Sequence, residues 1–238
     1  MGASRFSWTP DRFDAALFDL DGVLTPTADL HAAAWKRTFD GFLRERTGAT
    51  GEPFVPFDIA TDYTEYVDGK PRYEGVRSFL ASRGVELPFG EATAPPGFDT
   101  VCAIGNRKNQ LVNEFIAAGD VEVYPGSLAL VRQLRDRGIK TAVVSSSRNC
   151  RAVLQATGIE GLFDTRIDGI VAAERGLAGK PAPQTFLEAA KDLGVPPARA
   201  VVFEDAISGV EAGRAGNFGL VVGVDRRGDG EALRQHGA

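Results

Sequence analysis

Two aspartates stand two residues apart, directly after a short apolar run near the N-terminus. Asp19 and Asp21 follow the run Ala15-Ala-Leu-Phe18. Successive side chains of a strand point to opposite faces, so both carboxylates lie on one side if the strand geometry continues. Paired carboxylates suit general acid–base catalysis, nucleophilic catalysis or the binding of a hard cation. The alternative is an Asp-Gly turn that only closes the strand. A calcium-binding loop is excluded, because Gly22 comes too early and Val23 replaces a ligand.

A run of hydroxyl and amide side chains follows a second apolar segment. It consists of Ser145, Ser146, Ser147 and Asn149, directly after a Val-Val pair. These groups, with the backbone amides of the helix that follows, can form a cradle for an anion. The same residues also suit simple capping of that helix. There is no Gly-x-Ser-x-Gly sequence, which disfavours a serine hydrolase.

A lysine and a second acidic pair complete the candidate set. Lys180 precedes Pro181, which favours an extended backbone, so its ammonium can reach a site or remain in solvent. Glu204 and Asp205 directly follow the apolar run Val201-Val-Phe203. Oxygen ligands from Asp19, Asp205 and Glu204 suit Mg²⁺. Alternatively, the acidic pair only complements the dipole of a following helix.

The elements that carry these residues alternate between helix and strand. Five nearly all-apolar segments, most of them following a glycine that suits a helix end, predict strands over 15–18, 139–144, 163–168, 200–203 and 218–223. This alternation predicts an α/β fold with a Rossmann-like parallel sheet and helices on both faces. In such sheets a ligand binds beyond the carboxyl ends of the strands, where the polar residues described above stand.

Between about residue 29 and residue 121 the pattern becomes mostly helical. Helices are expected over 30–47, 72–83 and 106–118, separated by Gly- and Pro-rich loops near 48–56 and 88–98. We therefore expect a discontinuous core domain, residues 1–27 and 122–238, and an inserted helical cap domain, residues 28–121. Pro26 and Tyr124-Pro-Gly126 are the expected hinges.

Composition limits the function classes. The chain has 238 residues and a net charge of −5, which argues against a general nucleic-acid binder. The two cysteines, Cys102 and Cys150, cannot by themselves form a disulfide framework or a zinc site of four ligands, and the two histidines, His31 and His236, exclude a histidine-rich metal site. No apolar run approaches the ~20 residues that span a membrane, and the first residues lack the apolar centre of a signal peptide. We expect a cytoplasmic protein, monomeric by default, that binds a small molecule and neither nucleic acid nor membrane.

In their order and spacing these motifs resemble those of the haloacid dehalogenase superfamily of phosphotransferases. The resemblance comprises Asp19-x-Asp21-x-x-x-Thr25, then Ser145, then Lys180, then the pair Glu204-Asp205. Further segments are similar to the β-phosphoglucomutase-like subfamily: Leu30-His-Ala-Ala-Ala-Trp-Lys36, Asp68-Gly-Lys-Pro-Arg72 and Arg107-Lys-Asn109. The chain departs from the subfamily at Pro26, in a longer cap near 87–101 and in a longer loop over 174–179.

The resemblance implies a mechanism. Asp19 would be the nucleophile that forms an aspartyl-phosphate, and Asp21 the general acid and base. Mg²⁺ would be held by Asp19, Asp205, Glu204 and the backbone carbonyl of Asp21. Lys180 would offset the negative charge and Ser145 would bind a phosphate oxygen. The implied substrate-binding residues are His31, Trp35, Arg72, Lys108, Asn109, Ser146, Ser147 and Asn149, of which His31, Arg72 and Lys108 can equally be structural or surface residues.

Two enzyme classes and one binding function fit this resemblance. The leading hypothesis is a mutase that interconverts β-glucose 1-phosphate and glucose 6-phosphate through glucose 1,6-bisphosphate. The second is a phosphatase of sugar phosphates, in which water resolves the same phosphoenzyme. The third is a sugar-phosphate binder without catalysis. A cap that carries His31, Arg72 and Lys108 favours the mutase, because it suits a substrate with two phosphates.

Overall fold

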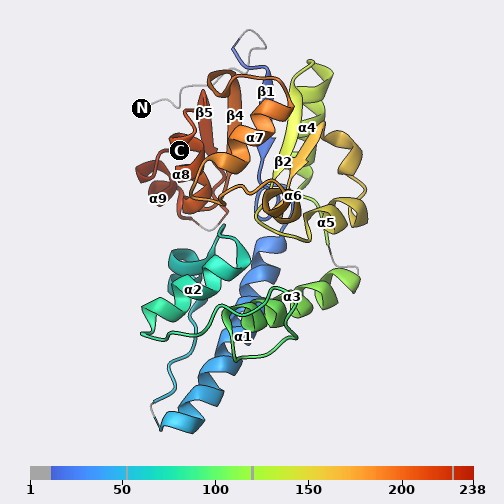
Figure 1. Cartoon of the computed structure of the whole chain (residues 1–238). Helices are drawn as coiled ribbons and strands as arrows, with labels where there is room; N and C mark the ends of the chain where they lie inside the picture. Colours follow the sequence, from blue (N-terminus) through green and yellow to red (C-terminus); the bar gives the residue numbers. More distant parts are fainter. Residues whose placement is uncertain (1–11, 52, 119–120, 227) are drawn as a thin grey trace.

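The computed structural model describes residues 12–51, 53–118, 121–226 and 228–238. Within them, five strands form one parallel sheet in the order β3-β2-β1-β4-β5 (Figure 1). The strands are β1 (Ala15–Phe18), β2 (Lys140–Val144), β3 (Thr165–Ile167), β4 (Ala200–Glu204) and β5 (Leu220–Gly223). The predicted α/β fold with a parallel sheet is thus confirmed, and β1 lies at its centre.

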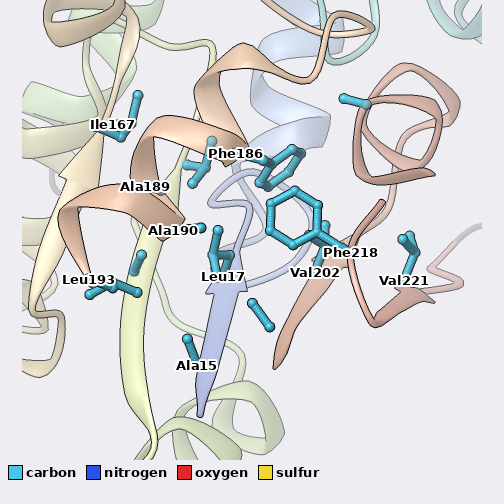
Figure 2. Packing of buried hydrophobic residues seen from close by; sticks show 14 of the residues in the cluster. Ala15, Leu17, Ile167, Phe186, Ala189, Ala190, Leu193, Val202, Phe218 and Val221 are labelled. Carbon is cyan, nitrogen blue, oxygen red and sulfur yellow. The ribbon is translucent and has the colours of Figure 1, made fainter. Parts of the chain in front are cut away.

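Helices cover both faces of the sheet. They are α4 (Pro125–Asp136), α5 (Cys150–Ala156), α6 (Gly169–Glu174), α7 (Gln184–Asp192), α8 (Ile207–Ala215) and α9 (Gly230–Gln235), with short 3₁₀ turns at Glu160–Leu162 and Pro197–Arg199. On one face Leu17 of β1 packs in the same apolar cluster as Phe186 of α7 (Figure 2). On the other face Phe18 packs with Val131 of α4 and Leu154 of α5. Burial on both faces explains why most residues of β1, β2, β4 and β5 are apolar, whereas the edge strand β3 (Thr-Arg-Ile) is less so.

The segment between β1 and α4 forms a helical layer with an apolar core of its own. It contains α1 (Thr27–Thr50), a π-helix η1 (Ile59–Val67), α2 (Arg72–Ser82) and α3 (Val101–Ala117). Its centre is Phe39, whose ring lies 5.0 Å from that of Trp35 and 4.1 Å from that of Phe79. Figure 1 shows this layer beyond the sheet edge at which the candidate site lies.

Several element ends differ from the sequence-based expectation. Helix α1 begins at Thr27 instead of residue 30. Helix α3 begins at Val101 instead of residue 106, because the Thr100 side chain accepts a hydrogen bond from the backbone amide of Ala103 and caps it. The π-helix η1 was not predicted, since polar residues interrupt its apolar pattern; its cap is Asp58.

The described part of the chain contains no helix long and apolar enough to cross a lipid bilayer. The N-terminal residues on which the absence of a signal peptide was judged lie largely outside the described residues.

Candidate active site

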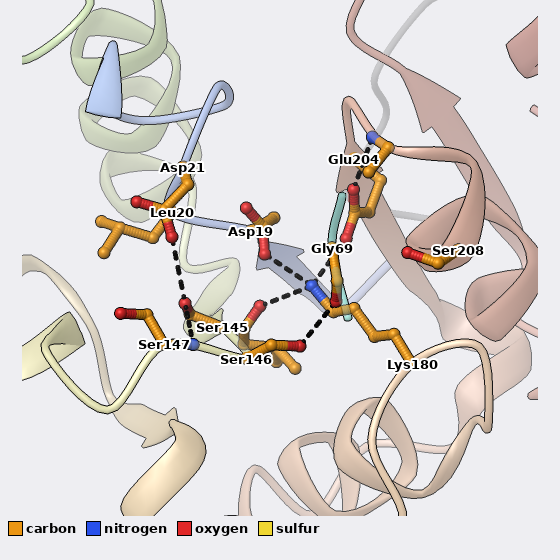
Figure 3. Close-up of polar contacts among 12 residues, drawn as sticks. Asp19, Leu20, Asp21, Gly69, Ser145, Ser146, Ser147, Lys180, Glu204 and Ser208 are labelled. Atoms are coloured by element: carbon orange, nitrogen blue, oxygen red, sulfur yellow. Dashed lines mark hydrogen bonds and ion pairs between the residues drawn. The ribbon is translucent and has the colours of Figure 1, made fainter. Parts of the chain in front are cut away.

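Three strands bring the polar residues together at one sheet edge. Phe18 pairs in register with Val143 of β2 and with Phe203 of β4. The residues that follow these positions therefore emerge side by side, among them Asp19, Ser145 and Glu204 (Figure 3). The turn after Asp21 requires glycine, because Gly22 has a φ of +85° and a Cβ there would lie 1.8 Å from Oδ2 of Asp205. The chain thus places Asp205 against the loop that carries the two aspartates.

Lys180 lies at the centre of the acidic group. Its Nζ donates hydrogen bonds to Oδ1 of Asp19 at 2.5 Å, Oε1 of Glu204 at 2.6 Å and the carbonyl of Val144 at 3.0 Å (Figure 3). The side chain is buried. Burial disfavours its positive charge, but the carboxylates of Asp19 and Glu204 together outweigh that effect and raise the pKa of Lys180. The lysine is a fixed cation beneath Asp19.

Three carboxylates can hold a metal ion here. One oxygen each of Asp19, Glu204 and Asp205 lies within 4.8 Å of the others. They face the single ammonium of Lys180, which leaves two negative charges. Burial raises the pKa of Asp19 well above its usual value, with the charges of Glu204 and Asp21 adding to the effect. A divalent cation with oxygen ligands, such as Mg²⁺, fits this donor set and would relieve the excess charge.

Within this group Glu204 already has protein partners for both carboxylate oxygens. Oε1 accepts from Lys180, and Oε2 accepts from the backbone amide of Ala206 at 2.9 Å. Gly209 packs directly against it, since a Cβ there would lie 1.7 Å from Oε1. The geometry therefore fits Glu204 better as the residue that positions Lys180 than as a direct ligand.

Asp21 has a different environment from Asp19. Its Oδ1 accepts a hydrogen bond from the Thr27 hydroxyl and lies 3.3 Å from Nε2 of His31. Its Oδ2 accepts from the Ser145 hydroxyl at 3.4 Å. Burial alone would raise the pKa of Asp21, but His31, Thr27 and Lys108 outweigh it and lower the pKa to about 2. The two carboxylates are thus held for different chemical roles.

A lysine of α3, in the helical layer, orients the histidine that contacts Asp21. Nζ of Lys108 donates to Nδ1 of His31, which leaves the proton of the imidazole on Nε2, toward Asp21. The ammonium lies 5.0 Å from the centre of the Trp35 ring. Burial lowers the pKa of Lys108 to about 7, and burial together with the charge of Lys108 lowers the pKa of His31. Lys108 therefore loses its charge readily near neutral pH.

One cavity of about 390 Å³, lined both by residues that follow the strands and by residues of the helical layer, brings nearly all the predicted site residues together. Its lining includes Asp19, Asp21, His31, Trp35, Arg72, Lys108, Asn109, Ser145, Ser146, Ser147, Asn149, Glu204 and Asp205. Lys180 does not line the cavity but reaches it through its bond to Asp19. The helical layer also contacts the sheet domain through a hydrogen bond of 3.0 Å from Nδ2 of Asn149 to Oδ1 of Asn109.

Arg72 is held at the cavity wall by the helix that packs beside it. The residue begins α2, and its Nη1 donates to the carbonyl of Gly105 at 3.5 Å and to Oδ1 of Asn106 at 3.3 Å, both on α3. Burial lowers its pKa, and the nearby charge of Arg148 contributes. Arg72 and Arg148 thus both line the cavity that also contains the acidic group.

The sequence-based reasoning missed some of the residues at the site. Arg148 and Tyr63 line the cavity, and Thr27 donates to Asp21. Arg148 stands inside the polar run that was singled out, so its position carried a signal. The sequence signal for Thr27 was weaker and consisted only of its position next to the expected hinge residue Pro26. Tyr63 belongs to the unpredicted π-helix η1 and had none.

Comparisons with known proteins agree with this geometry. A model of the haloacid dehalogenase-like hydrolase family matches residues 13–217. A β-phosphoglucomutase of Mycobacterium tuberculosis (strain CDC 1551 / Oshkosh) is 51% identical over 238 residues, which cover 99% of this chain and 91% of that protein.

Two solved structures have a similar fold. The crystal structure of β-phosphoglucomutase from Clostridium difficile matches with a TM-score of 0.69 and 25% identity, over 94% of this chain and 97% of that one. CbbY from Rhodobacter sphaeroides, solved in complex with xylulose-1,5-bisphosphate, matches with a TM-score of 0.64 and 26% identity, over 88% and 85% of the two chains. The likeness extends over both the sheet domain and the helical layer.

Proposed function

The chain belongs to the haloacid dehalogenase-like hydrolase family, and we propose that it interconverts β-glucose 1-phosphate and glucose 6-phosphate through glucose 1,6-bisphosphate. The observation that carries the proposal is the cavity, which has Asp19 on the core side and Arg72 and Arg148 on its walls. A substrate with two phosphates needs a nucleophile at one end and a cationic site at the other. The mycobacterial relative named β-phosphoglucomutase supports the same reaction.

Phosphoryl transfer begins at Asp19. The reaction needs a phosphorylated Asp19, formed when a carboxylate oxygen attacks phosphorus and the leaving oxygen departs. Lys180, 2.5 Å from Asp19, is positioned to offset the negative charge that gathers there. Ser145 and Ser147 line the same cavity, and the backbone amide of Ser147 donates to the Ser145 hydroxyl oxygen at 3.0 Å, which positions Ser145 to bind a phosphate oxygen. Asp19, Asp205 and the backbone carbonyl of Asp21 would hold Mg²⁺. The bound ion would neutralise charge on the phosphate that is being transferred.

Asp21 moves the proton. Its pKa of about 2 keeps it ionised at neutral pH, so it can accept the proton of the C6 hydroxyl as that oxygen attacks phospho-Asp19. After the bisphosphate has turned over, the 1-phosphate is transferred to Asp19. Asp21 then returns the proton to the departing O1, and the proton balance of the cycle closes. Thr27 and His31 hold the carboxyl in place for both steps.

The binding partners follow from the same geometry. The cavity is lined from the core and the cap of one chain, so we propose that a monomer suffices for activity. The small-molecule partner is a sugar phosphate, and the metal is Mg²⁺. Arg72 and Arg148 would hold the phosphate that is not being transferred, and Lys108 and Asn109 would contact sugar hydroxyls.

The test measures two products side by side. Purified protein with Mg²⁺ receives β-glucose 1-phosphate, with and without a trace of glucose 1,6-bisphosphate, and glucose 6-phosphate and inorganic phosphate are both quantified. We expect glucose 6-phosphate as the main product, a rate increased by the bisphosphate, and no turnover by Asp19→Asn. Stoichiometric release of phosphate without glucose 6-phosphate would instead identify a sugar-phosphate phosphatase, and neither product would indicate a binder.

A further inference from the structure

We propose that Ser208 is a positioning residue that holds a cap segment, Asp68–Pro71, against the core and so slows hydrolysis of the phosphoenzyme. This inference rests on the proposed function, because it concerns the aspartyl-phosphate on Asp19. Ser208 lies in the first turn of α8, three residues after Asp205. It is buried, yet it is not part of the cavity lining. Its hydroxyl does not contact the substrate space directly, and it bonds to the cap segment through the carbonyl of Asp68.

Two serines of the core bind consecutive carbonyls of this segment. The Ser208 hydroxyl donates to the carbonyl of Asp68 at 3.0 Å, and the Ser146 hydroxyl donates to the carbonyl of Gly69 at 2.7 Å. The two serines follow different strands, β4 and β2, and Figure 3 shows them on either side of Gly69. The segment is thus fixed from two sides to the sheet edge that carries Asp19.

The segment Asp68–Pro71 also packs closely against the core. Gly69 has a φ of +68°, and a Cβ there would lie 2.3 Å from Oγ of Ser208 and 3.1 Å from Cβ of Ala206. On the other side of the segment, a Cβ on Gly179 would lie 2.2 Å from Cγ of Pro71. The cap segment therefore packs directly on the core, through its backbone at Gly69 and through the side chain of Pro71 against Gly179, at distances that leave no room for water at these two contacts.

This packing affects how often water, in place of a sugar hydroxyl, attacks the phosphorus of phospho-Asp19. In hydrolysis a water oxygen attacks the phosphorus of phospho-Asp19, the bond between phosphorus and the carboxylate oxygen breaks, and inorganic phosphate leaves while Asp21 accepts the proton. Asp68, Gly69 and Pro71 line the cavity together with Asp19, so they close one side of the space that this water must enter. A looser segment admits water more often and closes over sugar less often.

The experiment compares Ser208→Ala with the parent and with a matched control, Ser82→Ala. Ser82 lies at the end of α2, in the helical layer, and its hydroxyl likewise donates to a backbone carbonyl, that of Phe79, but this bond stays within α2. Two rates are measured for each protein: bisphosphate-primed isomerisation of β-glucose 1-phosphate, and release of phosphate from acetyl phosphate through the phosphoenzyme. The result of interest is the ratio of hydrolysis to isomerisation.

We expect Ser208→Ala to raise this ratio roughly 2- to 12-fold, the range equivalent to one neutral hydrogen bond, while Ser82→Ala leaves it unchanged. Gly69→Ala, which forces the segment away from Ser208, should raise the ratio further. Thermal unfolding of each variant separates this effect from general destabilisation. An unchanged ratio in both Ser208→Ala and Gly69→Ala overturns the role of Ser208. A parent enzyme that forms no glucose 6-phosphate overturns the proposed function instead, and the hydrolysis rates of the variants still decide whether the segment excludes water.

Discussion

At the scale of single residues, Glu204 and Asp205 are neighbours with different tasks. Glu204 has both oxygens bound, one to Lys180 and one to the amide of Ala206, whereas Asp205 lies against Gly22 in the loop of the two aspartates. Lys180 in turn ties Glu204 to Asp19. The cation is therefore expected to depend on Asp205 more than on Glu204, although both were predicted as ligands.

The first prediction compares Asp205→Asn with Glu204→Gln. Asp205→Asn should weaken Mg²⁺ binding at least about tenfold, since a charged ligand is lost from a site that takes few carboxylates. Glu204→Gln should change Mg²⁺ affinity less but lower the free energy of unfolding by about 1–3 kcal/mol, because it weakens a buried bond to Lys180. Calorimetry with Mg²⁺ and urea unfolding measure the two effects. Equal loss of affinity in both variants would contradict this division.

The second prediction concerns the pH dependence that Lys108 imposes. Burial lowers its pKa from 10.5 to about 7. Between these two values the unfolded chain binds a proton on Lys108 that the folded protein does not, so stability rises with pH from about 7 toward 10.5. Lys108→Met should flatten this rise in the free energy of unfolding, while exposed Lys191→Met should not.

The parent's kcat/KM should also fall above pH 7, as the cation that supports substrate binding is lost. A parent stability that falls over this pH range in a Lys108-dependent way would refute the assignment.

At the scale of elements, the glycine turn after Asp21, between β1 and α1, packs against the residue that follows β4, Asp205. The positive φ of Gly22 and the approach of Asp205 explain why this turn needs glycine. Gly138, just before β2, offers a matched comparison, because it has a similar φ of +77° but nothing within 4 Å of its Cβ position.

The third prediction follows from that pair. Gly138→Ala should cost only the backbone strain of a left-handed residue, about 1–2 kcal/mol in the free energy of unfolding. Gly22→Ala should carry the same strain and, in addition, displace the Asp205 carboxylate, so Mg²⁺ affinity and turnover should fall by at least about tenfold. Urea unfolding and Mg²⁺ calorimetry on both variants test this. If Gly22→Ala binds Mg²⁺ with the same affinity as Gly138→Ala, the close contact between Gly22 and Asp205 does not affect metal binding.

The same elements show how far sequence reasoning reaches. Strands β1, β2 and β4 were predicted closely, because burial on both faces demands unbroken apolar runs, and the residues after them gave the core of the site. The start of α3 was misplaced by five residues, since its cap, Thr100, stands just after a Gly- and Pro-rich loop that hides the helix start. The π-helix η1, with Tyr63, follows no common periodicity and was missed. Contacts such as Ser208 to Asp68 depend on how the cap lies on the core, which local sequence patterns do not encode.

At the scale of the whole molecule, the site exists only where the core and the helical layer meet. The core supplies Asp19, Lys180 and the acidic pair, and the layer supplies His31 and Arg72. A phosphatase of small esters can work with the core part alone. A mutase must also hold the second phosphate and keep water from phospho-Asp19 while the bisphosphate turns over. Variants of the helical layer should therefore affect the two reactions unequally.

The last prediction uses this inequality. Arg72 is oriented by Gly105 and Asn106 and faces the cavity, so Arg72→Ala should remove a charge-assisted contact with the phosphate that is not transferred. Such a contact contributes about 1.5–3 kcal/mol, or roughly 10- to 150-fold in kcat/KM for isomerisation. Hydrolysis of acetyl phosphate, which has no second phosphate, should change by less than about threefold on the same reasoning. Arg77→Ala, on the exposed side of α2 beside Glu74, should leave both rates unchanged. Equal losses in both reactions for Arg72→Ala would mean that Arg72 supports the cap as a whole and does not bind the second phosphate.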